Sequence, residues 1–197
     1  MRDNAPVTSR RLSQAISEGD GISLVALVRD ADAARRAEEA GAEGLTVVRA
    51  IEGLREATDL PVLWRGGADP SSADAYALVV ARHLGGDGGL ETAHREVSEL
   101  GLEPVLEVHD DEELEVALER LDPEIFLLSG RSADEDEDPL DHVLGLLPDV
   151  PAGKLVIAEV PLRTRDEVLA LERAGIDAVL VEAERVAELV GGTPPEV

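Results

Sequence analysis

Eight short apolar runs, separated by charged segments of helical periodicity, constrain the fold of this 197-residue chain more than any other feature. This alternation is typical of βα repeats and predicts an α/β fold with a parallel sheet. Because eight parallel strands close a (β/α)8 (TIM) barrel, we expect one compact barrel domain over residues 1–197. The predicted strands are residues 23–29, 44–50, 61–66, 75–82, 103–109, 124–130, 154–160 and 178–184.

The segments between these strands predict helices of unequal completeness. Helical periodicity marks residues 9–18, 31–41, 51–58, 88–100, 111–121, 138–147 and 164–174. Only residues 66–74 separate the third and fourth strands, whereas a parallel crossover normally needs about a dozen residues or more. We therefore expect a bare loop in place of the third helix. The loop after the first strand and the eighth helix should also be short.

The composition excludes several classes of protein. The absence of cysteine rules out disulfides, thiolate metal sites and cysteine nucleophiles. No apolar stretch reaches about 18 residues, and the N-terminus lacks the apolar run of a secretory signal, so we expect a cytoplasmic protein with no membrane partner. The net charge of −25 would repel a nucleic acid backbone, so no nucleic acid partner is expected.

The pattern of charged residues leaves two explanations open. Lys154 is the only lysine, and arginine supplies the other 17 positive charges. This usage fits a salt-adapted (halophilic) proteome, or a GC-rich genome that favours arginine codons. We interpret the acidic segment 133–138 as a solvated charge run, with an ion-binding loop as the alternative. The glycine-rich segment 85–89 predicts a flexible turn, because it lacks the spacing and the lysine of a phosphate-binding loop.

Two segments carry a specific resemblance to a known family. LGLEPVLEVHDDEEL (100–114) and AEVPLRTRDEVLALERAGIDAVLV (158–181) resemble the fifth strand and the seventh-to-eighth-strand region of indole-3-glycerol-phosphate synthases. Weaker similarity extends the match from about Arg11 to about Ala187. The resemblance implies a (β/α)8 barrel and a carbon–carbon lyase of tryptophan biosynthesis that carries out a decarboxylating ring closure. No cofactor and no metal are expected.

The resemblance also implies a set of site residues. The catalytic candidates are the two strand-end carboxylates and the arginine that stands where the family has its general-acid lysine: Glu107, Glu159 and Arg65. The candidates for substrate binding are Arg29, Trp64, Ser129 and Arg131.

Other positions depart from the family pattern. The strand-one Glu–x–Lys pair is Leu27 and Arg29 here, the Ser–Gly after the strand-seven glutamate is Val160–Pro161, and a phosphate-binding glycine is Glu182. Arginine is a poor general acid near neutral pH, because its pKa lies above about 12. A carboxylate in place of the glycine would repel a phosphate dianion, and proline offers no N–H donor.

Several side chains keep two interpretations. Glu107 and Glu159 are either an acid–base pair or a structural pair neutralised by one of the strand-end arginines, Arg29, Arg65 or Arg131. Trp64 either stacks on a planar ligand or plugs the mouth of the barrel. His109 is either a general base or a neighbour of the following helix cap.

Three functions remain open. The first is a diverged member of the family, without the usual synthase activity, that acts on or binds another small anionic metabolite. The second is a functional synthase in which arginines replace the lysines. The third is a pseudoenzyme that serves as a scaffold or partner subunit. Because a missing third helix would expose apolar surface, we also expect a homodimer or a pathway partner.

Overall fold

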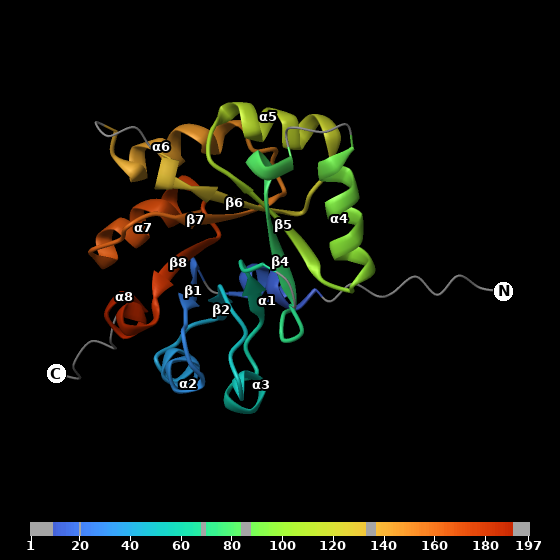
Figure 1. The fold of residues 1–197 in the computed structure, drawn as a ribbon. Helices are drawn as coiled ribbons and strands as arrows, with labels where there is room; N and C mark the ends of the chain where they lie inside the picture. The colour runs from blue at the N-terminus through green and yellow to red at the C-terminus, as the bar shows by residue number, and fades with distance from the viewer. Residues whose placement is uncertain (1–9, 20, 68–69, 84–87, 133–136, 191–197) are drawn as a thin grey trace.

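A closed barrel of eight parallel strands forms the centre of the molecule (Figure 1). The computed structural model of the chain describes residues 10–19, 21–67, 70–83, 88–132 and 137–190. Each strand pairs with its neighbours in chain order, and β1 pairs with β8 to close the ring. The predicted (β/α)8 barrel is therefore confirmed. The strands are β1 (Ser23–Leu27), β2 (Gly44–Val47), β3 (Val62–Trp64), β4 (Ala75–Val79), β5 (Glu103–Val108), β6 (Ile125–Ser129), β7 (Leu155–Glu159) and β8 (Ala178–Glu182).

Helices surround the strands, and α2, α5, α6 and α7 begin with a side-chain cap. The side chain of Asp30 accepts a hydrogen bond from the backbone N–H of Ala33 at the start of α2, and Thr164 and Glu167 form a capping box on α7. The helices are α1 (Arg11–Glu18), α2 (Ala31–Glu39), α3 (Leu54–Ala57), α4 (Gly89–Glu99), α5 (Asp111–Arg120), α6 (Pro139–Leu146), α7 (Arg165–Ala174) and α8 (Val186–Val190). Short 3₁₀ turns occur at η1 (Val80–His83), η2 (Gly130–Ser132), η3 (Leu147–Asp149) and η4 (Ala183–Arg185). No helix in the described part of the chain is long and apolar enough to cross a membrane.

The core has an inner and an outer layer. The inner layer fills the barrel with inward-facing strand residues such as Leu63 and Ile157, and α1 closes the bottom with Leu12 and Ile16. The outer layer packs the opposite strand faces against the surrounding helices. The buried carboxylate of Glu103 accepts hydrogen bonds from the first backbone N–H groups of α1, which holds this helix against the barrel.

The barrel is trimmed where the sequence predicts it. Three residues, 28–30, connect β1 to α2, and α8 has five residues in the described part of the chain. The described residues of the β3–β4 crossover, 65–67 and 70–74, contain no helix. The buried side chain of Asp74 holds this crossover in place, because it accepts a hydrogen bond from the Val62 N–H and pairs with two arginines, Arg11 and Arg55.

Two aromatic side chains cover the position of the missing helix. Trp64 and Tyr76 are paired neighbours on β3 and β4, and both pack in the outer layer. The Trp64 indole N–H donates to the carbonyl of Gly67 at 2.9 Å, and only 3% of the residue is exposed. The apolar surface expected beside the missing helix is therefore largely covered in the described part of the chain. The exposed large apolar side chains of the described residues follow β2 and α4 or lie within α8: Val48, Leu100 and Val190.

Candidate functional site

Four of the predicted site residues meet at the C-terminal ends of the strands. Side chains alternate across each strand, and this alternation points Glu107, Ser129 and Glu159 into the barrel mouth. Arg65 directly follows β3 and points the same way, while Ser129 and Glu159 are register partners on β6 and β7. This end of a (β/α)8 barrel is where such proteins carry their chemistry.

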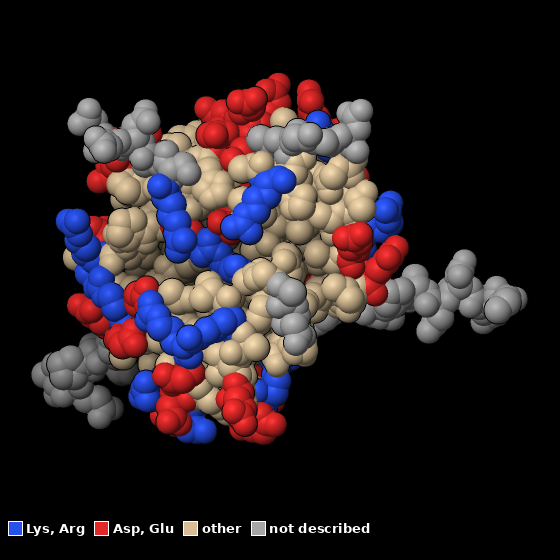
Figure 2. Space-filling view, viewed as in Figure 1, with Lys and Arg blue, Asp and Glu red and all other residues tan. Residues whose placement is uncertain are grey.

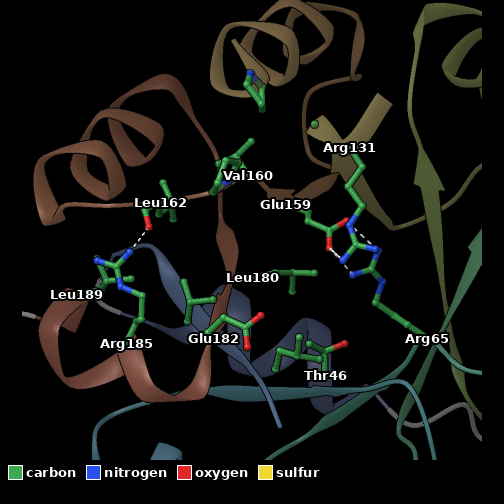
Figure 3. A pocket seen from close by; sticks show the side chains of 15 residues that line it. Thr46, Arg65, Arg131, Glu159, Val160, Leu162, Leu180, Glu182, Arg185 and Leu189 are labelled. Atoms are coloured by element: carbon green, nitrogen blue, oxygen red, sulfur yellow. Dashed lines mark hydrogen bonds and ion pairs between the residues drawn. The ribbon is translucent and has the colours of Figure 1, made fainter. Parts of the chain in front are cut away.

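One guanidinium, that of Arg65, holds both carboxylates, and Figure 3 shows its contact with Glu159. Arg65 donates to Glu107 from Nε (3.1 Å) and Nη2 (2.8 Å), and it donates to Glu159 from Nη1 (2.6 Å) and Nη2 (2.8 Å). The three side chains are 8%, 7% and 13% exposed. Arg65 thus makes two charge-assisted forks in a largely desolvated place, which is a strong form of arginine–carboxylate recognition.

These contacts determine the charge states of the cluster. Burial alone would raise the pKa of Glu159, but the hydrogen bonds and the charge of Arg65, with help from Ser129 and Arg131, outweigh it and hold this pKa below its ordinary value. Burial alone would lower the pKa of Arg65. The hydrogen bonds and charges of the two carboxylates raise it by more, so this pKa lies above its ordinary value. The cluster therefore contains an ionised Glu159 and a permanently charged Arg65 at neutral pH.

Ser129, at the end of β6, and Arg131, in the η2 turn that follows, complete the cluster. The Ser129 hydroxyl donates to Glu159 Oε2 at 2.8 Å. Arg131 Nη2 lies 2.6 Å from Glu159 Oε1, and 65% of the Arg131 side chain is exposed. Arg131 therefore contacts the cluster from the rim and keeps guanidinium surface for a ligand. Arg29 does not join the cluster, because its guanidinium pairs with Glu182 at 3.0 Å.

His109 lies beside the cluster between two carboxylates. Its Nε2 is 3.4 Å from Glu107 Oε1, and its Nδ1 is 3.0 Å from Glu113 Oε2. His142, on α6, contacts the His109 carbonyl through Nε2 at 2.7 Å. The ring is thus held on both sides near the cap of α5, which favours the interpretation of His109 as a neighbour of that cap.

Trp64 lies outside the site. Its indole packs in the outer layer between the sheet and the β3–β4 crossover, so it neither faces the cavity nor plugs the mouth. Both interpretations made from the sequence were wrong, because adjacent strand residues face opposite sides and Arg65 takes the inward position. We therefore remove Trp64 from the set of ligand-contacting candidates.

A cavity of about 540 Å³ opens beside the cluster (Figure 3). Arg65, Arg131 and Glu159 form part of its wall together with side chains that the sequence did not indicate, among them Thr46, Leu180 and Arg185. Thr46 could have been found from the alternation within β2. The contribution of Arg185 could not, because it depends on how η4 is placed next to the β7–α7 loop. 

A ring of arginines surrounds the mouth. An arginine follows the C-terminal end of seven of the eight strands, at positions 29, 49, 65, 82, 131, 163 and 185. Figure 2 shows blue side chains gathered around the central hollow, with acidic side chains mostly toward the periphery of this face. Arginine side chains are thus concentrated around the mouth of a chain whose net charge is −25. Exposed guanidinium groups at this face attract small anions.

The structure offers no clear metal site in its described part. No group of three or more His, Asp or Glu residues is arranged there to hold an ion. Residues 133–136 of the acidic segment and 85–87 of the glycine-rich segment lie outside the described residues.

Comparison with known proteins gives consistent results. The family model "Indole-3-glycerol phosphate synthase" matches residues 68–186. The enzyme of that name from Alkaliphilus metalliredigens is 30% identical over 144 residues, which cover 68% of this chain and 53% of the relative. The one from Acidithiobacillus ferrooxidans is 34% identical over 142 residues, which cover 66% and 52%. The chain thus spans about half the length of these curated relatives.

Among solved structures, the thiamine phosphate pyrophosphorylase from Pyrococcus furiosus superimposes with a TM-score of 0.63. The match covers 86% of this chain and 94% of that chain, at 18% sequence identity. At this identity the likeness supports the barrel fold alone.

Proposed function

The chain belongs to the indole-3-glycerol-phosphate synthase family, and from this premise we propose that it is a diverged member that binds a small anionic metabolite without catalysing the usual ring closure. The observation that carries the proposal is the double fork of Arg65 onto Glu107 and Glu159. The residues that the family resemblance marks as catalytic are bound to one another in this cluster.

This arrangement removes the means of proton transfer. A general acid works best when its pKa lies near the working pH, and a guanidinium does not release its proton there. Glu159 accepts hydrogen bonds from Arg65 and Ser129 and forms an ion pair with Arg131, and its pKa is held below the ordinary value, chiefly because the contacts with Arg65 outweigh the effect of burial. A carboxylate in this state is a weak base near neutral pH.

The region where the family resemblance implies phosphate binding also argues against the usual synthase substrate. Val160 and Pro161 follow β7, and Glu182 ends β8 with its carboxylate beside the cavity. Neither the proline nitrogen nor the carboxylate can donate a hydrogen bond to a phosphate oxygen.

Anion binding is supported by the arginines around the mouth. Arg131 is the best placed, because it lines the cavity and much of its side chain is exposed. A guanidinium binds a carboxylate or a phosphate through two parallel hydrogen bonds. The field of the other strand-end arginines would draw an anion to this face.

A second candidate is a functional synthase of tryptophan biosynthesis. The observation in its favour is that Arg65 brings a positive charge between the two carboxylates, at the position where the family resemblance implies a lysine. In that case charge alone, rather than proton donation, would have to promote the reaction.

The synthase reaction distinguishes the two candidates. Formation of indole-3-glycerol phosphate should be followed by indole fluorescence for the wild type, Arg65→Lys and Glu107→Gln, at low and at molar salt. We expect a folded wild type with no turnover above background. Wild-type turnover that is abolished in Glu107→Gln and raised in Arg65→Lys would establish the functional synthase and reject our proposal.

A further inference from the structure

We infer that the anion bound in this cavity is a small hydrophobic monocarboxylate and not a phosphate ester. The inference rests on the proposed function, since it names the ligand class of the same site. Three features of the described residues carry it: the apolar wall of the cavity, the balance of charges around it, and a buried hydroxyl group without a hydrogen-bond partner.

The first feature is the apolar wall. One side of the cavity is formed by side chains from the β7–α7 loop, β8 and α8: Val160, Pro161, Leu162, Leu180 and Leu189. Leu27, at the end of β1, adds a further apolar side chain at the position where the family resemblance implies a glutamate. A volume of about 540 Å³ holds a small organic molecule, and a wall of this kind favours an apolar body.

This wall is held in place by the polar contacts of Arg185. Its guanidinium donates to the backbone carbonyls of Leu162 and Arg163, and it pairs with Glu188 at 3.1 Å. These bonds connect the β7–α7 loop to the turn after β8. Because its donors are engaged by these groups, Arg185 contributes to the shape of the cavity more than to anion binding.

The second feature is the balance of charges. Arg65 and Arg131 offset the charges of Glu107 and Glu159, Arg29 offsets that of Glu182, and Glu188 offsets that of Arg185. The charged groups that line the cavity and their ion-pair partners thus sum to zero, which leaves no surplus of positive charge for a dianion. A phosphate monoester carries a charge of about −1.5 to −2 at pH 7, whereas a carboxylate carries −1 and suits a single exposed guanidinium.

The third feature is the hydroxyl group of Thr46. Thr46 is 1% exposed and lines the cavity, and its Oγ1 has no hydrogen-bond partner among the described residues. It lies on β2, which pairs with the β3 strand that Arg65 follows, and Figure 3 shows Thr46 and Arg65 on the side of the cavity opposite Leu162 and Leu189. A buried hydroxyl without a partner is costly, and a carboxylate oxygen or hydroxyl group of a ligand would satisfy it.

The ligand therefore has two ends. Its carboxylate lies at the polar end of the cavity, where Arg131 and Thr46 offer donors. Its apolar body lies against Leu180 and the side chains beyond it. This orientation predicts that both the head group and the body contribute to affinity.

Two probes with the same ring and different head groups test the inference. Isothermal titration calorimetry on the full chain should compare phenylacetate with phenyl phosphate, and acetate and inorganic phosphate serve as probes without an apolar body. We expect phenylacetate to bind at least about tenfold more tightly than each of the other three. We expect Arg131→Ala to weaken phenylacetate binding by about tenfold, and Leu27→Ser, at a half-buried position, to weaken it by about threefold.

A matched control is Arg120→Ala, which removes one positive charge from the end of α5, away from the mouth, and should leave the affinity unchanged. Phenyl phosphate binding that equals or exceeds phenylacetate binding, and is lost in Arg131→Ala, would overturn the inference while supporting an anion site. Equal binding of acetate and phenylacetate would also overturn it. No binding of any probe up to about 10 mM would reject both the inference and the proposed function.

Discussion

Replacing Arg65 with methionine should strongly destabilise the barrel at neutral pH. The substitution keeps an unbranched side chain of similar reach but removes the guanidinium that binds Glu107 and Glu159. Both carboxylates are at least 87% buried in their side chains, so water cannot fully take over its role. Removing one partner from a buried ion pair costs about 3–5 kcal/mol, and here two carboxylates lose the same partner. We therefore expect a loss of at least about 3 kcal/mol in the free energy of unfolding.

The stability of the wild type and of Arg65→Met should also change differently with pH. The pKa of Glu159 is held below its ordinary value because the contacts with Arg65 outweigh the effect of burial, so its contribution to stability is present above about pH 4.3 and is lost as the pH falls through the lowered pKa. Without Arg65, the buried carboxylate pair favours the uptake of a proton. The variant should thus gain stability between pH 7 and pH 5, whereas this cluster gives the wild type no such gain.

Urea unfolding at constant ionic strength measures both effects. Trp64 is the only tryptophan and directly precedes Arg65, so its fluorescence reports on this part of the barrel, and circular dichroism reports on the whole fold. The triple variant Arg65→Met, Glu107→Gln, Glu159→Gln serves as the control, because it removes all three charges and should recover most of the lost stability. An Arg65→Met variant as stable as the wild type at pH 7, with the same pH dependence, would refute this reasoning.

Three further predictions use the same unfolding assay. Gly66→Ala should cost about 1–3 kcal/mol, because the new Cβ would lie 2.5 Å from a backbone carbonyl oxygen and 2.9 Å from the indole, whereas Gly67→Ala meets nothing within 4 Å and should be near neutral; equal losses would contradict this. Asp74→Asn should cost about 2–4 kcal/mol, because the buried carboxylate serves two arginines and a β3 N–H, and an unchanged midpoint would contradict it. Glu103→Ala should cost about 1–3 kcal/mol by leaving the first N–H groups of α1 without their acceptor, and Glu103→Gln should cost less. Because burial raises the pKa of Glu103, the wild type should lose stability relative to the Gln variant as the pH rises through that pKa, and the opposite trend would contradict this assignment.

Most of the fold could be predicted from the sequence because its signals are local. The apolar runs that mark the strands, the capping box at Thr164 and the short β3–β4 connection each occupy a few neighbouring residues. Each predicted strand begins within one residue of the observed one. The predicted C-terminal ends of the strands lie beyond the observed ends, because the sequence pattern of the strands continues into the turns that follow them, such as η1 and η2.

The candidate site could be predicted only in part. The strand-end positions and the family resemblance indicated Glu107 and Glu159, but not which arginine would neutralise them. That choice depends on side-chain reach across the barrel, which brings residues 42 and 94 positions away from Arg65 into contact. Trp64 was misplaced because a shift of one residue reverses the face of a strand. The cavity depends on α8 packing against α7 and β1 and on Arg185 of η4 reaching the β7–α7 loop, and no local pattern contains that information.

The most direct test of the account is the titration of the Glu159 carboxylate, followed by carbon-13 NMR with the signal assigned from Glu159→Gln. If Arg65 holds this group ionised and removes it from acid–base chemistry, its chemical shift will remain constant from pH 8 to pH 5 and will change only below its ordinary pKa of about 4.3. A titration near neutral pH would show that Glu159 can exchange a proton under working conditions, and it would contradict the claim that the cluster is a neutralised ion-pair network.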